Sequence, residues 1–161
     1  MDELLNYLQL QSKAVPIGGG DTNQAYRVTD GERDYFLKYH PQMSADFFQA
    51  EVGGLEELSN FVRVPKVFRH GTFMEGAFIL MEWIEPGEGD QKDLAHALSK
   101  IHRVKADYFG YKKNNFIGVL PQINTFTRDW WDFYFTYRLE IQIEIAKGRN
   151  HWTTKREQNY Q

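Results

Sequence analysis

The sequence predicts an α+β fold in which a five-stranded antiparallel sheet with one helix precedes a partly helical region. Five short apolar segments bounded by turn residues lie in the first half of the 161-residue chain. One stretch with helical spacing separates the third of these segments from the fourth. From about residue 93 onward the apolar residues recur mainly at helical spacing, so we expect the remaining chain to form helices.

Composition and charge narrow the class of protein. Hydrophobic residues make up 42% and charged residues 25%, which is ordinary for a globular domain. The net charge of −3 and the lack of a basic stripe argue against nucleic-acid binding. The longest apolar runs are too short to cross a membrane. The chain has no cysteine and no leader-like N-terminus, so we expect a cytoplasmic protein without disulfides.

In the first region, residues 2–11 are expected to form a helix capped by Asp2, with its leucines on one face. Asp30-Gly31 is a strong hairpin signal between the second and third strands. A helix starting at the N-cap Ser44 then runs to about Asn60. The predicted strands cover residues 15–17, 24–29, 35–39, 66–70 and 78–83.

The second region begins after a Gly- and acid-rich stretch. We therefore expect a sheet domain over residues 1–85, a hinge over 86–92 and a helical region over 93–161. A helix is predicted up to about Arg103, followed by a loop. A long helix from 127 or 128 to 147 comes next, and the polar end of the chain from 151 is expected to fray unless it continues a helix.

The predicted long helix is rich in aromatic residues, which occupy six of the eight positions from 130 to 137. A helix apolar on all sides is normally buried on all sides, so we expect residues 128–147 to pack on further protein or to self-associate.

One lysine and one glutamate stand out among apolar neighbours. Lys38 shares its strand face with Phe36, and Glu51 lies on a helix face made otherwise of apolar residues. An unpaired charge on a core-facing surface is costly, so the two residues are expected to pair. The alternative for Lys38 is an edge-strand lysine that only discourages aggregation.

A glycine-rich turn precedes this pair. Gly18-Gly19-Gly20 is followed by Asp21-Thr22-Asn23 and lacks both the third glycine of the kinase loop and the lysine of the P-loop. By itself it is a flexible hairpin. Ahead of Lys38 and Glu51, it is interpreted as a phosphate cover with side-chain hydrogen bonds from Thr22 and Asn23.

Other candidate motifs are not assigned a catalytic or metal-binding role. Asp107-Tyr108-Phe109-Gly110 differs from a D-F-G metal motif by an extra tyrosine, and His102 is interpreted as a packed or capping residue. No histidines and carboxylates have metal-ligand spacing. We therefore assign no catalytic or metal-binding residue in this chain.

The chain resembles the N-terminal portion of the fructosamine/ketosamine kinases, in the aminoglycoside-phosphotransferase-like branch of the protein-kinase-like fold. The most specific element is Ile117-Gly118-x-Leu120-Pro121-Gln122-x-Asn124. The other matching segments are 19–28, 36–38, 49–51, 79–83, 98–103, 109–110, 115–116 and 129–130.

The resemblance implies ATP as phosphoryl donor, Mg²⁺ as counter-ion and a sugar hydroxyl of a ketosamine, a glycated amine, as acceptor. It implies that Lys38 binds the α- and β-phosphates with Glu51 as its partner. The implied nucleotide-binding residues are Gly19, Gly20, Asp21, Thr22, Asn23, Lys38, Glu51, Met81, Glu82, Trp83 and Ile84. Residues implied on the acceptor side are Asn115, Gln122, Asn124 and Trp130.

The sequence departs from the family pattern in one respect. Family members carry an H-G-D catalytic loop and a second metal-binding aspartate, and this sequence contains no His-Gly-Asp. Phosphoryl transfer depends on positioned metal ions and a carboxylate that orients the nucleophile. We therefore expect the 161-residue chain to bind nucleotide without turnover. The alternative is a catalytically dead nucleotide-binding or protein-interaction module of the same fold.

Overall fold

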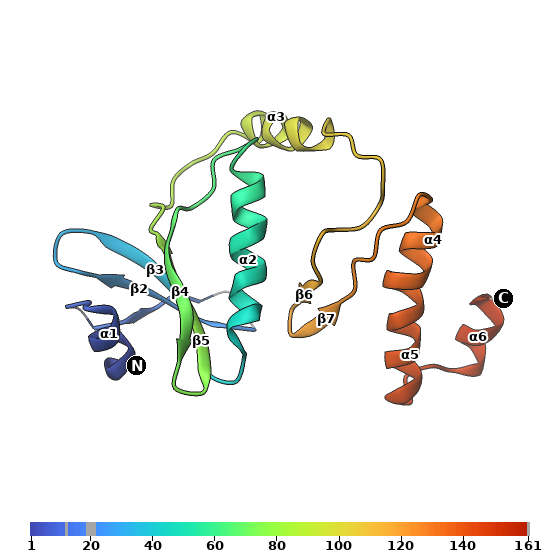
Figure 1. Cartoon of the computed structure of the whole chain (residues 1–161), viewed down its shortest axis with the longest axis horizontal. Helices are drawn as coiled ribbons and strands as arrows, with labels where there is room; N and C mark the ends of the chain where they lie inside the picture. Colours follow the sequence, from blue (N-terminus) through green and yellow to red (C-terminus); the bar gives the residue numbers. More distant parts are fainter. Residues whose placement is uncertain (12, 19–21, 161) are drawn as a thin grey trace. The chain divides into compact units, whose positions relative to one another are not determined.

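The computed structural model describes residues 1–11, 13–18 and 22–160. The chain divides into two compact units, Met1–Val104 and Lys105–Gln161. The first contains the sheet, and the second contains a small hairpin and the C-terminal helices (Figure 1). Among the described residues, none of the helices has the length and apolar character that a membrane span requires.

The first unit is built on a five-stranded antiparallel sheet, as predicted. Its strand order is β1-β2-β3-β5-β4. The strand β5, not β4, therefore pairs with β3, and β4 forms the edge of the sheet. The strands are β1 (Val15–Pro16), β2 (Gln24–Thr29), β3 (Asp34–His40), β4 (Val67–Phe73) and β5 (Gly76–Glu82).

The turn between β2 and β3 forms where the sequence predicts it. Oδ1 of Asp30 accepts hydrogen bonds of 2.9 Å from the backbone N–H groups of Glu32 and Arg33. Gly31 has a φ of 101°, a conformation that favours glycine. This turn sets the register that places Ala25 opposite Lys38.

Two helices cover the two faces of the sheet (Figure 1). The helix α1 (Asp2–Leu8) buries three leucines against one face, and α2 (Ala45–Leu58) packs on β4 and β5 with Phe48 fully buried. Strand β5 is buried on both sides because it lies between these layers. The predicted cap at Asp2 is wrong: Met1 is the N-cap, and Asp2 lies in the first turn. There its negative charge still interacts favourably with the positive end of the helix dipole.

A third helix, α3 (Gln91–His102), follows a stretch without regular structure. Its N-cap is Asp90, whose carboxylate accepts a 2.8 Å hydrogen bond from the N–H of Lys92. The helix belongs to the same compact unit as the sheet, whereas the sequence pattern groups it with the second region. The hinge at 86–92 stays a prediction.

The second unit differs from the sequence prediction at the hairpin, at the end of the chain and within the long helix. The predicted loop contains a hairpin of β6 (Asn115–Ile117) and β7 (Leu120–Gln122), whose three-residue strands are too short for a periodic signal. The polar end forms α6 (Thr154–Tyr160) instead of fraying, because the Tyr160 ring packs on Trp152 and on Phe135.

The predicted long helix forms in three consecutive segments. They are α4 (Trp130–Tyr134), the π-helix η1 (Phe135–Glu140) and α5 (Ile141–Gly148). Asp129 caps the first segment by accepting a hydrogen bond from the N–H of Asp132. Sequence periodicity does not distinguish the wider π turn from an ordinary helix, so the prediction missed η1.

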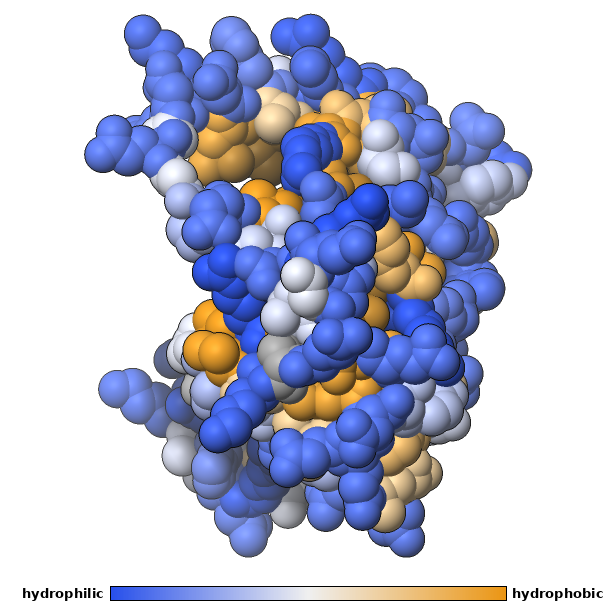
Figure 2. All heavy atoms as spheres, turned by 90° about the vertical axis from the view of Figure 1, so that its left-hand side faces the viewer, coloured by the Kyte–Doolittle hydropathy of each residue, from blue (hydrophilic) through white to orange (hydrophobic). Residues whose placement is uncertain are grey.

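Aromatic side chains on this helix stay accessible within the second unit. Trp130, Trp131 and Tyr134 are about half exposed, whereas the rings of Phe133, Phe135 and Tyr137 are partly covered. On the face of the molecule in Figure 2, apolar side chains form separate patches among hydrophilic ones.

Candidate nucleotide site and acceptor-side pocket

Lys38 and Glu51 form the ion pair that the sequence predicts. The Nζ of Lys38, in the middle of β3, lies 2.7 Å from Oε1 of Glu51 on α2. Both side chains are about a quarter exposed, at 26% and 28%. The pair is therefore partly shielded from water and still open to a ligand.

The local structure explains why the two side chains meet. Alternation along β3 places Lys38 on the sheet face opposite Leu37, whose side chain is fully buried toward α1. On α2, Phe48 and Val52 are buried, and Glu51 lies between them in sequence at the border of that buried stripe. The apolar contacts of α2 thus fix the position of the carboxylate over β3.

A line of aromatic and cationic side chains continues from Lys38 across the same face. The Phe36 ring lies 6.0 Å from the Lys38 ammonium and stacks on Trp83 at 6.3 Å. The Arg27 guanidinium lies 4.7 Å from the Trp83 ring and pairs with Asp34, whose hydrogen bond raises the pKa of Arg27. This surface beside the ion pair offers flat rings, and the Arg27 charge is balanced by Asp34 and by Glu85 at 3.8 Å.

The segment predicted to contact adenine, Met81 to Ile84, begins with the last two residues of β5 and runs beyond it. Met81 is buried, and the carboxylate of Glu82 is held by Arg63 at 2.7 Å and by the N–H of Lys66 at 3.2 Å. The N–H of Glu82 also donates to the carbonyl of Lys66, at 2.8 Å. Ile84 is half exposed, and no hydrogen bond within the described part of the chain involves it. Its backbone is therefore available to a ligand.

The glycine turn is described only in part. Gly19, Gly20 and Asp21, which the sequence pattern assigns to phosphate binding, lie outside the described residues. Of the two polar residues that follow, Thr22 is half-buried, and Oδ1 of Asn23 is buried without a hydrogen-bond partner among the described residues. A buried acceptor without a partner is costly, and only a group that donates a hydrogen bond would relieve that cost, which a phosphate oxygen does not do.

Metal-binding side chains do not gather in the part of the chain that the structure describes. Within residues 1–11, 13–18 and 22–160, no group of three or more His, Asp or Glu side chains could hold a metal ion. The described side chains alone therefore do not enclose a metal ion, although Mg²⁺ beside a nucleotide is usually held by only one or two carboxylates together with the phosphates.

Three of the four residues predicted on the acceptor side, Asn115, Gln122 and Asn124, lie together at the β6–β7 hairpin of the second unit, whereas Trp130 lies on the helix against Tyr134. Asn124 is buried, and its Nδ2 donates to Oδ1 of Asn115 at 2.8 Å. Oδ1 of Asn124 accepts a hydrogen bond from Arg138, which sequence reasoning missed. Trp130 stacks on Tyr134 at 4.9 Å, with only 8° between the ring planes. A charged residue in the middle of an aromatic helix was the signal that could have identified Arg138.

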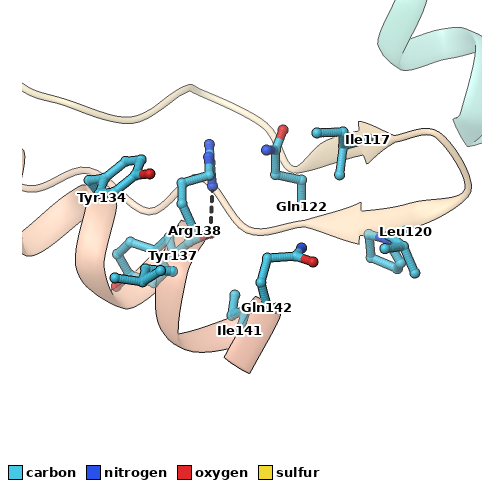
Figure 3. A pocket seen from close by; sticks show the side chains of 10 residues that line it. Ile117, Leu120, Gln122, Tyr134, Tyr137, Arg138, Ile141 and Gln142 are labelled. Atoms are coloured by element: carbon cyan, nitrogen blue, oxygen red, sulfur yellow. Dashed lines mark hydrogen bonds between the residues drawn. The ribbon is translucent and has the colours of Figure 1, made fainter. Parts of the chain in front are cut away.

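Gln122 lines a pocket of about 350 Å³ between the β6–β7 hairpin and the helix (Figure 3). The side chains of Gln122, Tyr134 and Gln142 border it, and the last two were not predicted. The complete lining is Ile117, Leu120, Pro121, Gln122, Tyr134, Tyr137, Arg138, Leu139, Ile141 and Gln142.

A family model described as fructosamine kinase matches residues 2–161 of this chain. The chain belongs to the fructosamine kinase family. Over 157 residues it is 51% identical to the "Probable ketoamine kinase" of Enterococcus faecium, covering 98% of this chain and 57% of that protein. It is 37% identical over 161 residues to the chloroplastic protein-ribulosamine 3-kinase of japonica rice, covering 92% of this chain and 47% of that protein.

The fold agrees with this membership. A crystal structure of a candidate fructosamine-3-kinase from Haemophilus somnus 129PT superimposes with a TM-score of 0.78 at 22% identity, covering 86% of this chain and 49% of that one. The predicted protein-kinase-like α+β fold and the family resemblance are thus confirmed. The chain spans about half the length of the curated relatives it matches.

Proposed function

We propose that this fructosamine kinase family chain is the nucleotide-binding portion of an ATP-dependent kinase that phosphorylates a sugar hydroxyl of glycated amines. The observation that carries the proposal is the Lys38–Glu51 ion pair, 2.7 Å long and partly buried between β3 and α2. A pair with this exposure contributes little to stability, so a ligand-binding role explains it better.

In this proposal Lys38 binds the α- and β-phosphates of ATP. Its ammonium has three N–H donors, and Glu51 accepts one of them, which leaves two for phosphate oxygens. Glu51 also restricts the flexible lysine side chain and thereby lowers the entropy cost of binding. When bound, ATP supplies the phosphoryl group that is transferred.

The remaining nucleotide contacts come from two segments. The glycine turn with Thr22 and Asn23 covers the phosphates, to which the Thr22 hydroxyl and the Asn23 side-chain NH₂ can donate hydrogen bonds. The adenine lies along Met81–Ile84, supported by the Ile84 backbone, to which no described residue hydrogen-bonds, and by the Trp83–Phe36 stack. Adenine recognition through backbone groups is compatible with the apolar side chains found there.

A second candidate has the same fold and a different activity. Within the described residues no group of three or more His, Asp or Glu side chains could hold a metal ion, and the sequence contains no His-Gly-Asp. These two observations favour a nucleotide-binding or protein-interaction module without catalysis. For the 161-residue chain on its own we therefore expect ATP binding and no turnover of a ketosamine.

The proposal is tested by thermal unfolding with and without Mg²⁺-ATP. ATP should raise the melting temperature of the chain, and Lys38→Ala should abolish the shift. Lys92→Ala, which removes an exposed lysine on α3, is the matched control and should keep the shift. Equal shifts in the wild type and Lys38→Ala would reject the phosphate role of Lys38. ADP release with fructosyl-lysine would show that the chain is active and would exclude the non-catalytic candidate.

A further inference from the structure

Arg63 lies next to the segment assigned to adenine and is not among the predicted site residues. We propose that Arg63 is a positioning residue, which fixes the start of the adenine-contacting segment Met81–Ile84 through its ion pair with Glu82. The ligand of that segment rests on the proposed function, whereas the ion pair and its supports are contacts within the first unit.

The carboxylate of Glu82 is bound at two points to the chain between α2 and β4. Its Oε1 accepts a hydrogen bond from Nη2 of Arg63 at 2.7 Å, and its Oε2 accepts one from the backbone N–H of Lys66 at 3.2 Å. The N–H of Glu82 donates to the carbonyl of Lys66 at 2.8 Å. Both carboxylate oxygens thus have partners within the chain, so Glu82 holds the backbone in place and does not contact the base.

The segment that carries Arg63 is itself fixed to the end of α2. The backbone N–H of Val62 donates to the carbonyl of Leu58 at 3.0 Å, and the side chain of Asn60 donates to the carbonyl of Glu57 at 3.0 Å. These bonds satisfy carbonyls that the last turn of a helix leaves without a partner. Arg63 therefore extends from a segment that is anchored on a helix.

The same helix supports both ends of the proposed nucleotide site. Glu51, within α2, pairs with Lys38, and Arg63, shortly after the end of α2, pairs with Glu82. The spacing between the lysine and the adenine segment is thus set by one helix and the segment attached to it. Groups that are already in place before the ligand arrives lower the entropy cost of binding.

Ile84 is the residue whose backbone this arrangement presents to a ligand. Its neighbour Trp83 stacks on Phe36 at 6.3 Å and donates from Nε1 to the carboxylate of Glu85. Residues on both sides of Ile84 are therefore held by side-chain contacts. No hydrogen bond within the described part of the chain involves the Ile84 backbone, which leaves it available to a base.

A role in folding alone explains the Arg63–Glu82 pair less well. The Arg63 side chain is 64% exposed and the Glu82 side chain 34%, and an ion pair with this exposure contributes little to stability. Arg63→Ala should therefore leave the melting temperature of the ligand-free chain nearly unchanged. Its effect should appear in binding of the base.

The first test is calorimetric titration of the chain with adenosine and with tripolyphosphate. Arg63→Ala should raise the Kd for adenosine about three- to tenfold, because the segment must then be ordered as the base binds, and should leave the Kd for tripolyphosphate unchanged. Arg63→Lys keeps a donor for Glu82 and should restore most of the adenosine affinity. Arg69→Ala removes an exposed arginine that contacts Tyr7 instead, and this matched control should change neither Kd.

The second test needs no ligand. Hydrogen exchange of the Glu82 N–H should be faster in Arg63→Ala than in the wild type and Arg69→Ala, since loss of the ion pair frees the end of β5. Equal exchange rates, an unchanged Kd for adenosine, or an equal loss for tripolyphosphate would overturn the positioning role of Arg63. If the wild-type chain binds neither adenosine nor ATP, the nucleotide assignment fails, and the exchange rate at Glu82 still decides whether Arg63 fixes this segment.

Discussion

Lys38 of β3 and Glu51 of α2 lie thirteen positions apart in sequence and join the sheet to the helix through a 2.7 Å hydrogen-bonded ion pair. The pair is partly screened by water, so its net contribution to folding is small, about 0–1 kcal/mol. Its main effect is to hold a cation at a fixed place beside Phe36 and Trp83.

A double-mutant cycle measures the energy of this pair. Lys38→Met and Glu51→Gln should each destabilise the chain slightly, with a coupling energy of about 0.5–1 kcal/mol by urea unfolding. Purely additive single effects would show that the two side chains do not interact in solution.

Gly110 is expected to tolerate no side chain. Its φ is 131°, and an added Cβ would lie 2.9 Å from the carbonyl oxygens of Asn124 and Thr125. Gly110→Ala should therefore reduce the free energy of unfolding by about 2–4 kcal/mol. Gly148→Ala is the matched control, because a Cβ there meets nothing within 4 Å, and it should be neutral or stabilising. Similar losses in both variants would contradict the packing described at Gly110.

The β2–β3 turn should make stability depend on acid pH. Hydrogen bonds from the Tyr35 hydroxyl, and from the backbone N–H groups of Arg33 and Glu32, lower the pKa of Asp30 to about 2. The unfolded carboxyl has a pKa of about 4, so the unfolded state binds the proton first as pH falls. The stabilisation is complete above about pH 4 and is lost toward pH 2. The melting temperature should fall more steeply over this interval in the wild type than in Asp30→Asn, and equal slopes would contradict the role of Asp30.

The sheet was predictable because its signals are local. Asp30-Gly31 marks the hairpin, and strand alternation places Lys38 and Leu37 on opposite faces. The pairing of Lys38 with Glu51 followed from the cost of leaving two charges alone among apolar residues. The strand exchange that puts β5 beside β3 depends on contacts distant in sequence, and no local pattern encodes it.

The second unit was less predictable, because its elements are short or irregular and its contacts join residues that are distant in sequence. The β6–β7 hairpin has strands of three residues, and the π turn leaves no periodic trace. The link between Asn124 and Arg138 spans fourteen positions and becomes visible only when the hairpin and helix are placed together. Gln122 was predicted from the family motif, whereas Tyr134 and Gln142 required the pocket.

The aromatic helix over residues 128–147 should drive self-association of the 161-residue chain. Trp130, Trp131 and Tyr134 are about half exposed, which leaves large rings uncovered. Light scattering should give a mass above the 19.0 kDa of one chain, and Trp131→Glu should lower it. A monodisperse monomer in the wild type would contradict this expectation.

Calorimetric titration of the chain with ATP and with adenosine tests most directly whether Lys38 binds the phosphates. Lys38→Ala should weaken ATP binding at least about tenfold, since one charge-assisted hydrogen bond contributes about 1.5–3 kcal/mol, and should leave the Kd for adenosine unchanged. An unchanged Kd for ATP, or equal losses for both ligands, would contradict the phosphate-binding role of Lys38.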